Sequence, residues 1–505
     1  MENNVVKVML YDKEIGMLYW DVKSKRAVFN YNDTFVKENI DFAPLTAPIS
    51  IYKNRPVLGN KEKLFQGLPP FLADSLPDHW GNKVFEAWAA QNHIPKRQLT
   101  PVDKLSFIGK RGMGAFEFLP ATPGLDSSQS LQIDSLYKLA LQIFTERQEF
   151  TVQENEELNL QSIYEVGTSA GGKHPKAIIA INNKTHEIQS GQVIHPGDFT
   201  YYILKFSESD DFPYTQMEMA YYEMALKAGI HIMPSKLIDI DGKYHFLTER
   251  FDRQRGQKTH TQTLAAMNPD ASSYEELFEV SRRLRISSTE QSELYRRMVF
   301  NILSGNVDDH TKNFSFMWID NEWHITPAYD ITFTVNLDGA SYENVHSITL
   351  KGMDCDFSEE DLLDFAKLNG IKNPKRIINE VSMAVSHFYD FASKYNIDIY
   401  WKDKIEEYLS GLVTKDVATS MNHYLPTVIE PYTSAEGFTV SNITIVENGQ
   451  HDFRLDAIIN GKRYGIRANH RSELATEIRN KGRNKMSVVY MKDLVQRHLF
   501  PLINP

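Results

Sequence analysis

The sequence predicts an α+β chain that begins with a β-rich part, continues through a mixed lobe and a helical lobe, and ends in a small α/β appendage. Short alternating or apolar runs, separated by polar turns, open the chain. Beyond residue 253, apolar residues recur at i, i+3 and i+4, which is the period of helices packed on a core. Strand-like runs return near residue 433. We expect the four parts to cover residues 1–125, 126–252, 253–430 and 431–505.

The expected elements follow from these patterns in chain order. The first part should contain strands at 6–11 and 16–20 and a helix at 82–91. The mixed lobe should contain helices at 133–146 and 215–228 and strands at 176–182, 200–206, 236–240 and 245–248. The helical lobe should contain helices at 273–284, 288–303, 359–368, 375–395 and 402–413, with a β segment at 313–325. The appendage should contain strands at 438–446 and 453–459, followed by helices.

Composition excludes several classes of protein. With 505 residues and 42% hydrophobic residues, the chain should fold into two to four domains. We expect no signal peptide, because residues 1–7 do not form a basic region followed by an apolar core. We expect no membrane span, because no apolar run reaches about 18 residues. The single Cys355 excludes an internal disulfide, which fits a reducing cytoplasm. A net charge of −11 argues against binding of nucleic acid by the whole molecule.

Asp308, Asn313 and Asp330 form a set that suits phosphoryl transfer. Asp308 and Asn313 lie five residues apart, as do the Asp and Asn of the common protein-kinase catalytic loop. In that chemistry one Asp takes or orients the proton of the attacking hydroxyl, and the Asn and a second Asp hold Mg²⁺ against the ATP phosphates. A polar turn is the simpler interpretation of the segment alone. The choice depends on whether the rest of an ATP site lies upstream.

Residues 167–176 include small residues that let backbone N–H groups approach phosphates. Gly167 to Lys173 also fits the start of a P-loop, G-x-x-x-x-G-K. However, His174 stands where a Ser or Thr is required, and Pro175 with a strand-like run follows where a helix is required. Strand, glycine loop and strand is the arrangement of a kinase loop that covers ATP. A flexible turn between strands remains the alternative.

Lys205 lies inside an apolar, strand-like run, where an unpaired ammonium would be costly to bury. It can be the lysine that contacts ATP phosphates, with Glu218 or Glu223 of the next helix as its partner, or an exposed lysine on an edge strand. Residues 249–253 close a strand at the place where a hinge would bind adenine. Local ion pairs are the alternative there. Six weak elements in the order of an ATP site make a strong combined signal.

This assembly resembles the HipA family of bacterial serine/threonine kinases, the toxins of one class of toxin–antitoxin module. The resemblance runs from near residue 1 to about residue 425 and implies a two-lobed, protein-kinase-like fold. The His-Arg-Asp and Asp-Phe-Gly markers of ordinary protein kinases are absent from the sequence. The motifs that carry the resemblance are 76–81, 111–119, 167–176, 203–205, 249–253, 308–315 and 327–330.

The resemblance implies roles for individual residues. Asp308 would be the catalytic base, Asn313 and Asp330 would bind Mg²⁺, and Asp309 has no assigned chemistry. Phosphorylation of the family's own glycine loop would fall on Ser169 or Thr168. The positions implied to bind ATP are Ala170, Gly171, Gly172, Lys173, His174, Pro175, Lys176, Lys205, Glu218, Glu249, Arg250, Phe251, His310, Lys312 and Tyr329.

The resemblance also implies a function and partners. The protein would use ATP and Mg²⁺ to phosphorylate Ser or Thr of a protein, with an aminoacyl-tRNA synthetase as the suggested target and growth arrest as the outcome. A helix-turn-helix antitoxin similar to HipB would be its partner and would supply DNA binding. A small-molecule kinase and a non-catalytic subunit that acts through the antitoxin are the alternatives.

The C-terminal appendage extends beyond the resemblance. Residues 461–500 hold ten Lys or Arg and three Asp or Glu, a local balance of +7. A solvated helix face is the simpler interpretation. A patch for nucleic acid or for an acidic partner is the functional one.

Overall fold

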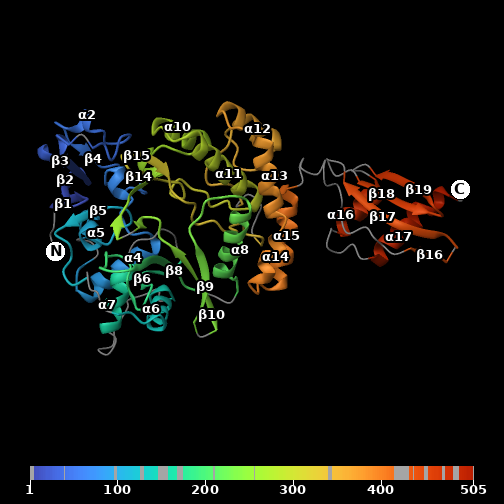
Figure 1. The fold of residues 1–505 in the computed structure, drawn as a ribbon, viewed down its shortest axis with the longest axis horizontal. Coiled ribbons are helices and arrows are strands. Elements are labelled where there is room, and N and C mark those ends of the chain that lie inside the picture. The colour runs from blue at the N-terminus through green and yellow to red at the C-terminus, as the bar shows by residue number, and fades with distance from the viewer. Residues whose placement is uncertain are drawn as a thin grey trace.

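The computed structural model describes residues 5–38, 40–95, 99–125, 130–145, 157–167, 174–208, 211–240, 242–254, 256–338, 344–413, 431–435, 437–447, 453–468, 472–481 and 488–503. These residues form four hydrophobic cores, the first three of which draw on interleaved stretches of the chain. Figure 1 shows the first sheet at one end, the helical lobe in the middle and the appendage at the other end. The predicted glycine-loop residues Thr168, Ser169, Ala170, Gly171, Gly172 and Lys173 lie outside the described residues.

The first sheet is antiparallel and has the strand order β4-β3-β2-β1-β5. Its inner face packs on four short helices to form the first core, which is rich in phenylalanine. The strands are β1 (Val5–Leu10), β2 (Lys13–Asp21), β3 (Arg26–Tyr31), β4 (Val57–Leu58) and β5 (Phe116–Leu119). The helices are α1 (Asp33–Val36), α2 (Ile49–Tyr52), α3 (Pro70–Ala73) and α5 (Pro101–Ile108).

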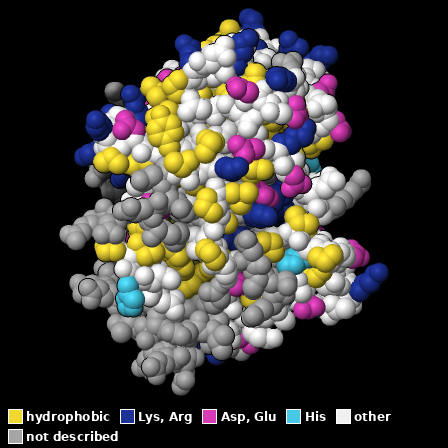
Figure 2. Space-filling model, turned by 90° about the vertical axis from the view of Figure 1, so that its left-hand side faces the viewer, with side chains coloured by type: hydrophobic (Ala, Val, Ile, Leu, Met, Phe, Trp, Pro, Cys, Tyr) yellow, Lys and Arg dark blue, Asp and Glu magenta, His cyan; other side chains and the backbone are white. Residues whose placement is uncertain are grey.

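The outer face of this sheet keeps apolar side chains exposed. Val5, Met17 and Tyr19 point outward, in agreement with the antiparallel pairing of Val5 with Tyr19 on neighbouring strands. Val5 and Met17 line a shallow hollow with Leu119 and Pro120. Figure 2 views this side of the molecule and shows hydrophobic side chains gathered on it.

The second sheet is also antiparallel, with the order β7-β6-β8-β10-β9. Helices α4, α6 and α7 pack with its buried side chains to form the second core. The strands are β6 (Lys176–Asn182), β7 (Ile188–Ser190), β8 (Phe199–Lys205), β9 (Ser235–Ile240) and β10 (Lys243–Glu249). The helices are α4 (His79–Gln91), α6 (Ile133–Thr145) and α7 (Glu157–Val166).

The helical lobe has the largest core. Helix α8 packs in this core, although in the sequence it lies between β8 and β9 of the second sheet. Its helices are α8 (Tyr214–Lys227), α9 (Leu264–Met267), α10 (Tyr274–Arg283), α11 (Ser288–Ser304), α12 (Glu359–Leu368), α13 (Pro374–Val385), α14 (Phe388–Lys394) and α15 (Ile399–Val413). Two small sheets accompany them, formed by β11 (Arg253–Gln254) with β12 (Gln257–Lys258), and by β13 (His260–Thr263), β14 (Ser315–Ile319) and β15 (Glu322–Ile325).

The appendage has its own core, which contains only residues beyond 432. Its antiparallel sheet is β16 (Tyr432–Thr433), β17 (Thr439–Glu447), β18 (Phe453–Ile459) and β19 (Lys462–Ala468). Helices α16 (Glu473–Lys481) and α17 (Val488–His498) and the 3₁₀ turn η6 (Phe500–Leu502) complete it. Among the described residues, no helix combines the length and apolar character needed to cross a bilayer.

The structure confirms the predicted α+β organisation, with differences in detail. The helix expected at 375–395 is two helices, because α13 ends before His387 and α14 begins after it. Helix α7, rather than a strand, precedes the glycine segment. Helix α5 was not predicted, although Thr100 and Asp103 form a capping box around Pro101.

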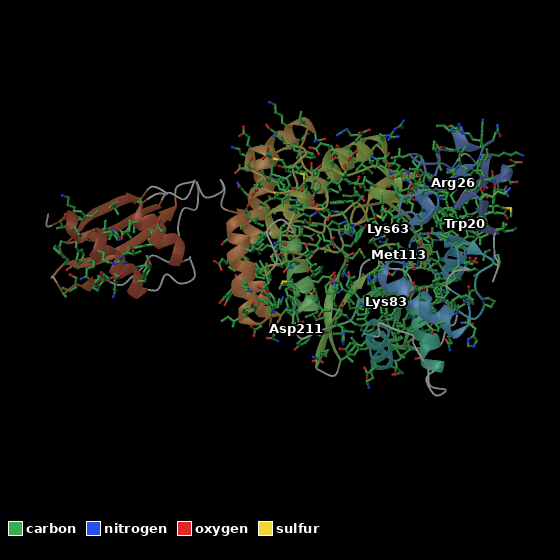
Figure 3. The ribbon with its side chains drawn as sticks, turned by 180° about the vertical axis from the view of Figure 1, so that it is seen from behind. Trp20, Arg26, Lys63, Lys83, Met113 and Asp211 are labelled. Carbon is green, nitrogen blue, oxygen red and sulfur yellow. The ribbon has the colours of Figure 1, made fainter. Side chains whose placement is uncertain are left out.

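The turn at Gly112 and Gly114 ties the first sheet to the rest of the chain. Asp252 accepts a hydrogen bond from the Gly114 N–H at 2.7 Å. Arg253 donates to the carbonyls of Gly112 (2.7 Å) and Gly114 (2.9 Å). Met113 marks this turn in the view from behind (Figure 3). The predicted motif at 111–119 is therefore a buried junction.

Candidate active site

The ammonium of Lys205, the last residue of β8, lies between two carboxylates. Its Nζ donates to Oε1 of Glu218 on α8 at 2.6 Å and also to Oδ1 of Asp330. Glu223, the other candidate partner, instead accepts from Lys394 and Tyr395 at the end of α14. The structure thus brings together a lysine, a helix glutamate and the Asp330 carboxylate.

The charges of this cluster are strongly interdependent. Burial lowers the pKa of Lys205, but Asp330 and Glu218 outweigh that effect and raise it. Burial opposes ionisation of Asp330 as well, yet Lys205, Lys176 and His310 hold its pKa below the usual value. The pKa of Glu218 is raised by burial, which the Lys205 charge offsets only in part. Lys205 and Asp330 therefore form an ionised pair, and Glu218 is the carboxyl group that protonates more readily.

The loop that carries Asp308 begins where α11 ends. Gly305 has a left-handed backbone (φ 66°), a conformation that glycine adopts without strain, and turns the chain out of the helix. The backbone N–H groups of Val307 and Asp308 both donate to the Thr334 hydroxyl, at 2.8 and 3.1 Å. The Asp308 side chain is exposed, and its carboxylate makes no hydrogen bond or ion pair with any described residue. It is therefore accessible to a substrate.

Asp309, next in sequence, is a buried structural residue. Its carboxylate accepts hydrogen bonds from the Tyr274 hydroxyl, from the backbone N–H of Ser347 at 2.8 Å and from Nδ1 of His346 at 2.8 Å. The Tyr274 hydroxyl in turn accepts from Asn301 on α11. The two adjacent aspartates thus differ completely in environment. The network holds the segment that carries Asp308 in place.

Asn313 and Asp330 present oxygen atoms of the kind that Mg²⁺ prefers. The amide nitrogen of Asn313 donates to the Asp308 carbonyl at 2.7 Å, so the amide oxygen is the ligand atom that it can offer. Asp330, with a left-handed backbone (φ 50°), uses one carboxylate oxygen for Lys205 and keeps the other. Among the described residues, no group of three or more His, Cys, Asp or Glu could hold a metal ion. A site that completes its shell with phosphate oxygens fits this donor set.

His310 and Lys312 lie in the same loop. Nδ1 of His310 is buried and has no hydrogen-bond partner among the described residues. His310 is among the groups that lower the pKa of Asp330. Burial raises the pKa of Asp74, and the charge of Lys312 partly offsets this rise. A buried ring nitrogen without a partner among the described residues, in the loop that carries Asn313, suits an incoming phosphate.

The predicted hinge is close to the Asp330 segment. The rings of Phe251 and Tyr329 face each other with centroids 5.7 Å apart. The Tyr329 hydroxyl donates to the Lys312 carbonyl at 2.7 Å and contacts Ser315. These contacts connect the hinge segment, the loop after Asp308 and Asp330.

Arg250 was predicted to bind ATP, but its side chain lies in the interior. The guanidinium forms a two-point ion pair with Asp252, at 2.8 and 2.9 Å, and donates to the Gly191 carbonyl at 2.8 Å. The backbone N–H groups of Glu249 and Arg250 donate to Pro234 and Tyr201. Of the two interpretations of residues 249–253, local ion pairs therefore account for the side chain of Arg250.

Lys176 begins β6, directly opposite Lys205 on β8, and is buried. Its Nζ donates to Oδ2 of Asp78 at 3.2 Å, and its carbonyl accepts from the Trp80 indole at 2.9 Å. Asp78 also caps helix α4. Sequence reasoning assigned Asp78 and Trp80 no role, although an Asp immediately before a helix is a typical N-cap.

His174 and Pro175 end the glycine segment. Nδ1 of His174 contacts Glu208, and the ring packs on Tyr214 with centroids 4.7 Å apart. The Pro175 carbonyl accepts from the Phe206 N–H at 3.0 Å. These contacts fix the entry to β6 next to Lys205.

Comparison with known families shows the family of this chain. The pattern of the HipA N-terminal domain matches residues 6–119, and that of the HipA-like C-terminal domain matches residues 168–388. The chain belongs to the HipA family. The C-terminal domain match contains Lys205, Asp308, Asn313 and Asp330, and the N-terminal domain match contains Asp78.

Two relatives of this chain have names that contain the word kinase. Y4mE of Sinorhizobium fredii is 27% identical over 210 residues, which are 36% of this chain and 49% of Y4mE. A protein of Haemophilus influenzae is 26% identical over 186 residues, 32% of this chain and 52% of its own length. The chain therefore spans about half the length of these relatives.

A solved HipA structure shares the fold. It comes from the complex of HipA, HipB and operator DNA of the Shewanella oneidensis MR-1 toxin–antitoxin system. The match has a TM-score of 0.57 at 16% identity and covers 81% of this chain and 96% of that one. This likeness confirms the predicted kinase-like fold, and residues beyond 431 lie outside both domain matches.

Proposed function

We propose that this HipA-family protein is a kinase that transfers the γ-phosphate of ATP to a Ser or Thr hydroxyl of a protein. One observation carries the proposal. The Lys205 ammonium already bridges Glu218 and Asp330, and the accessible Asp308 lies in the adjoining loop with Asn313. A lysine held by a helix glutamate beside a metal-binding Asp is the arrangement that phosphoryl transfer requires.

Each residue has a distinct task in this proposal. Asp308 accepts the proton of the attacking hydroxyl, and its exposure leaves room for a substrate. Lys205 binds ATP phosphates, and Glu218 fixes the ammonium in place. The backbone of Glu249 to Phe251 binds the adenine, and His310 donates or accepts at a phosphate through its free ring nitrogen.

Asn313 and Asp330 would hold Mg²⁺, which neutralises the phosphate charge when it is bound. The lowered pKa of Asp330 keeps this ligand ionised at neutral pH. The donor set consists of oxygen atoms, which suits Mg²⁺ better than softer metal ions.

The proposal includes phosphorylation of the protein's own glycine segment at Ser169 or Thr168. A phosphate there would add about −1.5 to −2 charges next to the place where ATP phosphates bind. Like charges in one cradle repel, so the modification would inactivate the kinase.

We also propose that a HipB-like helix-turn-helix antitoxin is the partner and supplies DNA binding. The solved complex of HipA, HipB and operator DNA supports this partner class. An aminoacyl-tRNA synthetase is the substrate class that we propose, with growth arrest as the consequence.

The test is mass spectrometry of the purified protein after incubation with Mg-ATP, with and without cell lysate. We expect phosphate on Ser169 or Thr168 and on one or more lysate proteins, and we expect neither in Asp308→Asn protein. Phosphorylated small molecules without phosphoprotein would favour a small-molecule kinase. Absence of any ATP turnover, together with antitoxin binding, would favour the non-catalytic alternative.

A further inference from the structure

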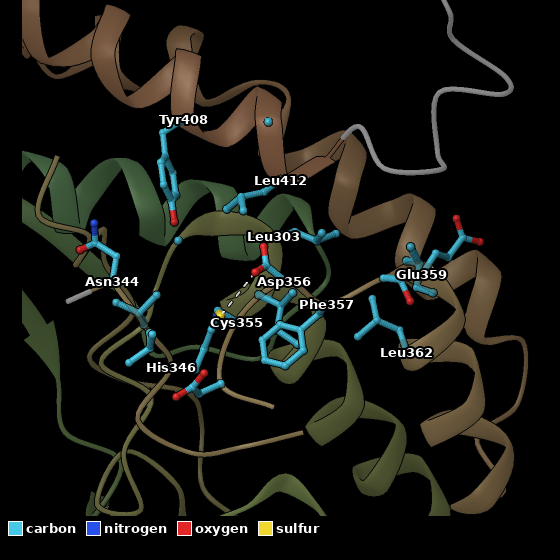
Figure 4. Close-up of a pocket in the computed structure, with 18 of the residues that line it drawn as sticks. Leu303, Asn344, His346, Cys355, Asp356, Phe357, Glu359, Leu362, Tyr408 and Leu412 are labelled. Carbon is cyan, nitrogen blue, oxygen red and sulfur yellow. Dashed lines mark hydrogen bonds between the residues drawn. The ribbon is translucent and has the colours of Figure 1, made fainter. Parts of the chain in front are cut away.

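A cavity of about 850 Å³ lies in the helical lobe behind the Asp308 loop. Its volume is within the usual range of small-molecule sites. Helices α11, α12, α13 and α15 and the segment 344–358 surround it (Figure 4). None of the cluster of Lys205, Glu218 and Asp330 lines it, so it is separate from the candidate active site.

The lining combines carboxylates with aromatic and aliphatic side chains. Asp354, Asp356, Glu359 and Glu407 line it, whereas none of the described lining residues is Lys or Arg. Aromatic rings come from Phe357 and Tyr408, and aliphatic side chains come from Ile302, Leu303, Val307, Leu362, Ile378 and Leu412. Carboxylates beside aromatic faces are the groups that recognise organic ammonium ions.

The carboxylates of the lining affect two titratable groups of the cavity. Partial desolvation raises the pKa of the Cys355 thiol, and the carboxylates of Asp356 and Asp354 raise it further. Burial raises the pKa of Tyr408 as well, again with a contribution from Asp356. The Cys355 thiol is 3.6 Å from Oδ2 of Asp356 (Figure 4).

The cavity wall is continuous with the catalytic loop. Val307, which precedes Asp308, lines the cavity. His346 also lines it, and its Nδ1 contacts the buried Asp309 carboxylate at 2.8 Å. The neighbouring Ser347 holds the loop through Asp309 and through the Val307 carbonyl. A molecule seated in the cavity would thus touch Val307 directly and reach Asp309 through His346.

We propose that this cavity binds a small organic ammonium ion with an apolar body, and that the bound ion changes the position of Asp308 through His346 and Asp309. The assignment of a ligand site rests on the cavity and on the negative charge of its carboxylate lining. The coupling to Asp308 rests on the proposed kinase function.

The single cysteine of the chain allows a direct test of the charge selectivity. Cys355 lines the cavity and is exposed. Methanethiosulfonate reagents react with it when the thiolate displaces methanesulfinate and a mixed disulfide forms. Rates are measured by intact-mass spectrometry for the cationic trimethylammonioethyl reagent and for the anionic sulfonatoethyl reagent. Each rate is divided by the rate at which the same reagent reacts with 2-mercaptoethanol. The thiolate fraction of Cys355 is common to both reagents, so it cancels in the ratio of the two normalised rates.

We expect the normalised ratio to favour the cationic reagent on the order of ten-fold at low salt. It should fall toward one in Asp354→Asn/Asp356→Asn protein. If the Asp354→Asn/Asp356→Asn protein unfolds at too low a temperature to be labelled, Glu407→Gln on another wall of the cavity serves as the second variant. Phenyltrimethylammonium should slow labelling by neutral methyl methanethiosulfonate, and benzenesulfonate at equal ionic strength should not. A ratio near one in the wild type, or no protection by the cation, would overturn the ligand assignment.

The coupling is tested on the same labelled protein. Attachment of the trimethylammonioethyl group to Cys355 should change kcat for ATP turnover at least several-fold with little change in the affinity for ATP. The same treatment of Cys355→Ser protein should leave its turnover equal to that of the untreated variant. Unchanged kcat after complete labelling would overturn the coupling. If unlabelled protein turns over no ATP, the kinase proposal fails, while the labelling ratios still decide the ligand site.

Discussion

Replacement of each of the two adjacent aspartates by asparagine should separate catalysis from stability. The Asp308 carboxylate is exposed and contacts no described side chain, so Asp308→Asn should change the free energy of unfolding by less than about 0.5 kcal/mol. If Asp308 is the base, turnover should fall by about 10²–10⁴. This variant should therefore fold normally and be nearly inactive.

Asp309→Asn should have the opposite profile. Asparagine replaces a buried carboxyl group that accepts hydrogen bonds from Tyr274, His346 and Ser347. One of its side-chain atoms becomes an N–H donor that faces another donor, so that one buried hydrogen bond is lost. We expect the helical lobe to lose roughly 3 kcal/mol, which corresponds to a melting temperature lower by roughly 6–12 °C.

Differential scanning calorimetry measures the melting temperatures, and radiolabelled ATP turnover is measured well below the lower of them. Wild-type turnover in Asp308→Asn protein would refute its assignment as the base. A wild-type melting temperature in Asp309→Asn protein would refute the structural role of the network. An inactive but normally stable Asp309→Asn protein, together with an active but destabilised Asp308→Asn protein, would show that the two residues had been assigned the wrong way round.

The remaining predictions concern α8 and pH. Glu218→Gln should lower kcat/KM for ATP roughly 10–100-fold, because a neutral amide oxygen replaces the carboxylate that holds Lys205. Glu223→Gln on the same helix should leave kcat/KM unchanged, since Glu223 pairs with Lys394 and Tyr395. Equal losses in the two variants would contradict the pairing. The pKa of Asp361 is lowered to about 2 by Lys351 and by a Ser hydroxyl. Its ionised form therefore stabilises the fold above about pH 4, and this contribution is lost as the pH falls toward 2. Urea unfolding should show a smaller loss over that window in Asp361→Asn protein; an identical pH profile would contradict it.

Sequence patterns predicted the secondary structure where the signal was local. The strand at 176–182 and the helix at 359–368 have the predicted bounds, because the strand is a continuous apolar run bounded by turn residues and the helix combines a clear period with an N-cap. The break between α13 and α14 was missed, since apolar residues continue through His387 at helical spacing. Helix α5 could have been found from its capping box.

From the sequence alone, the site could be predicted only as a set of candidate residues. The sequence offered Glu218 as the partner of Lys205 with Glu223 as the alternative, and five residues along a helix place the two about 140° apart, so only one can face the second sheet. Arg250 was predicted to bind ATP because of its motif, whereas its guanidinium is committed to Asp252 and the Gly191 carbonyl. The glycine-loop assignments and the metal ligands remain predictions.

The sequence by itself determined the order of the elements, the five-residue spacing of Asp308 and Asn313 and the family, because these depend on neighbours along the chain. Only the tertiary structure decided that Lys205 meets Asp330, 125 residues away, and that Asp309 is buried while Asp308 is not. It also revealed the acidic cavity behind the loop. Such contacts arise from the packing of sheets and helices on shared cores, and packing joins residues whose separation in the sequence carries no signal.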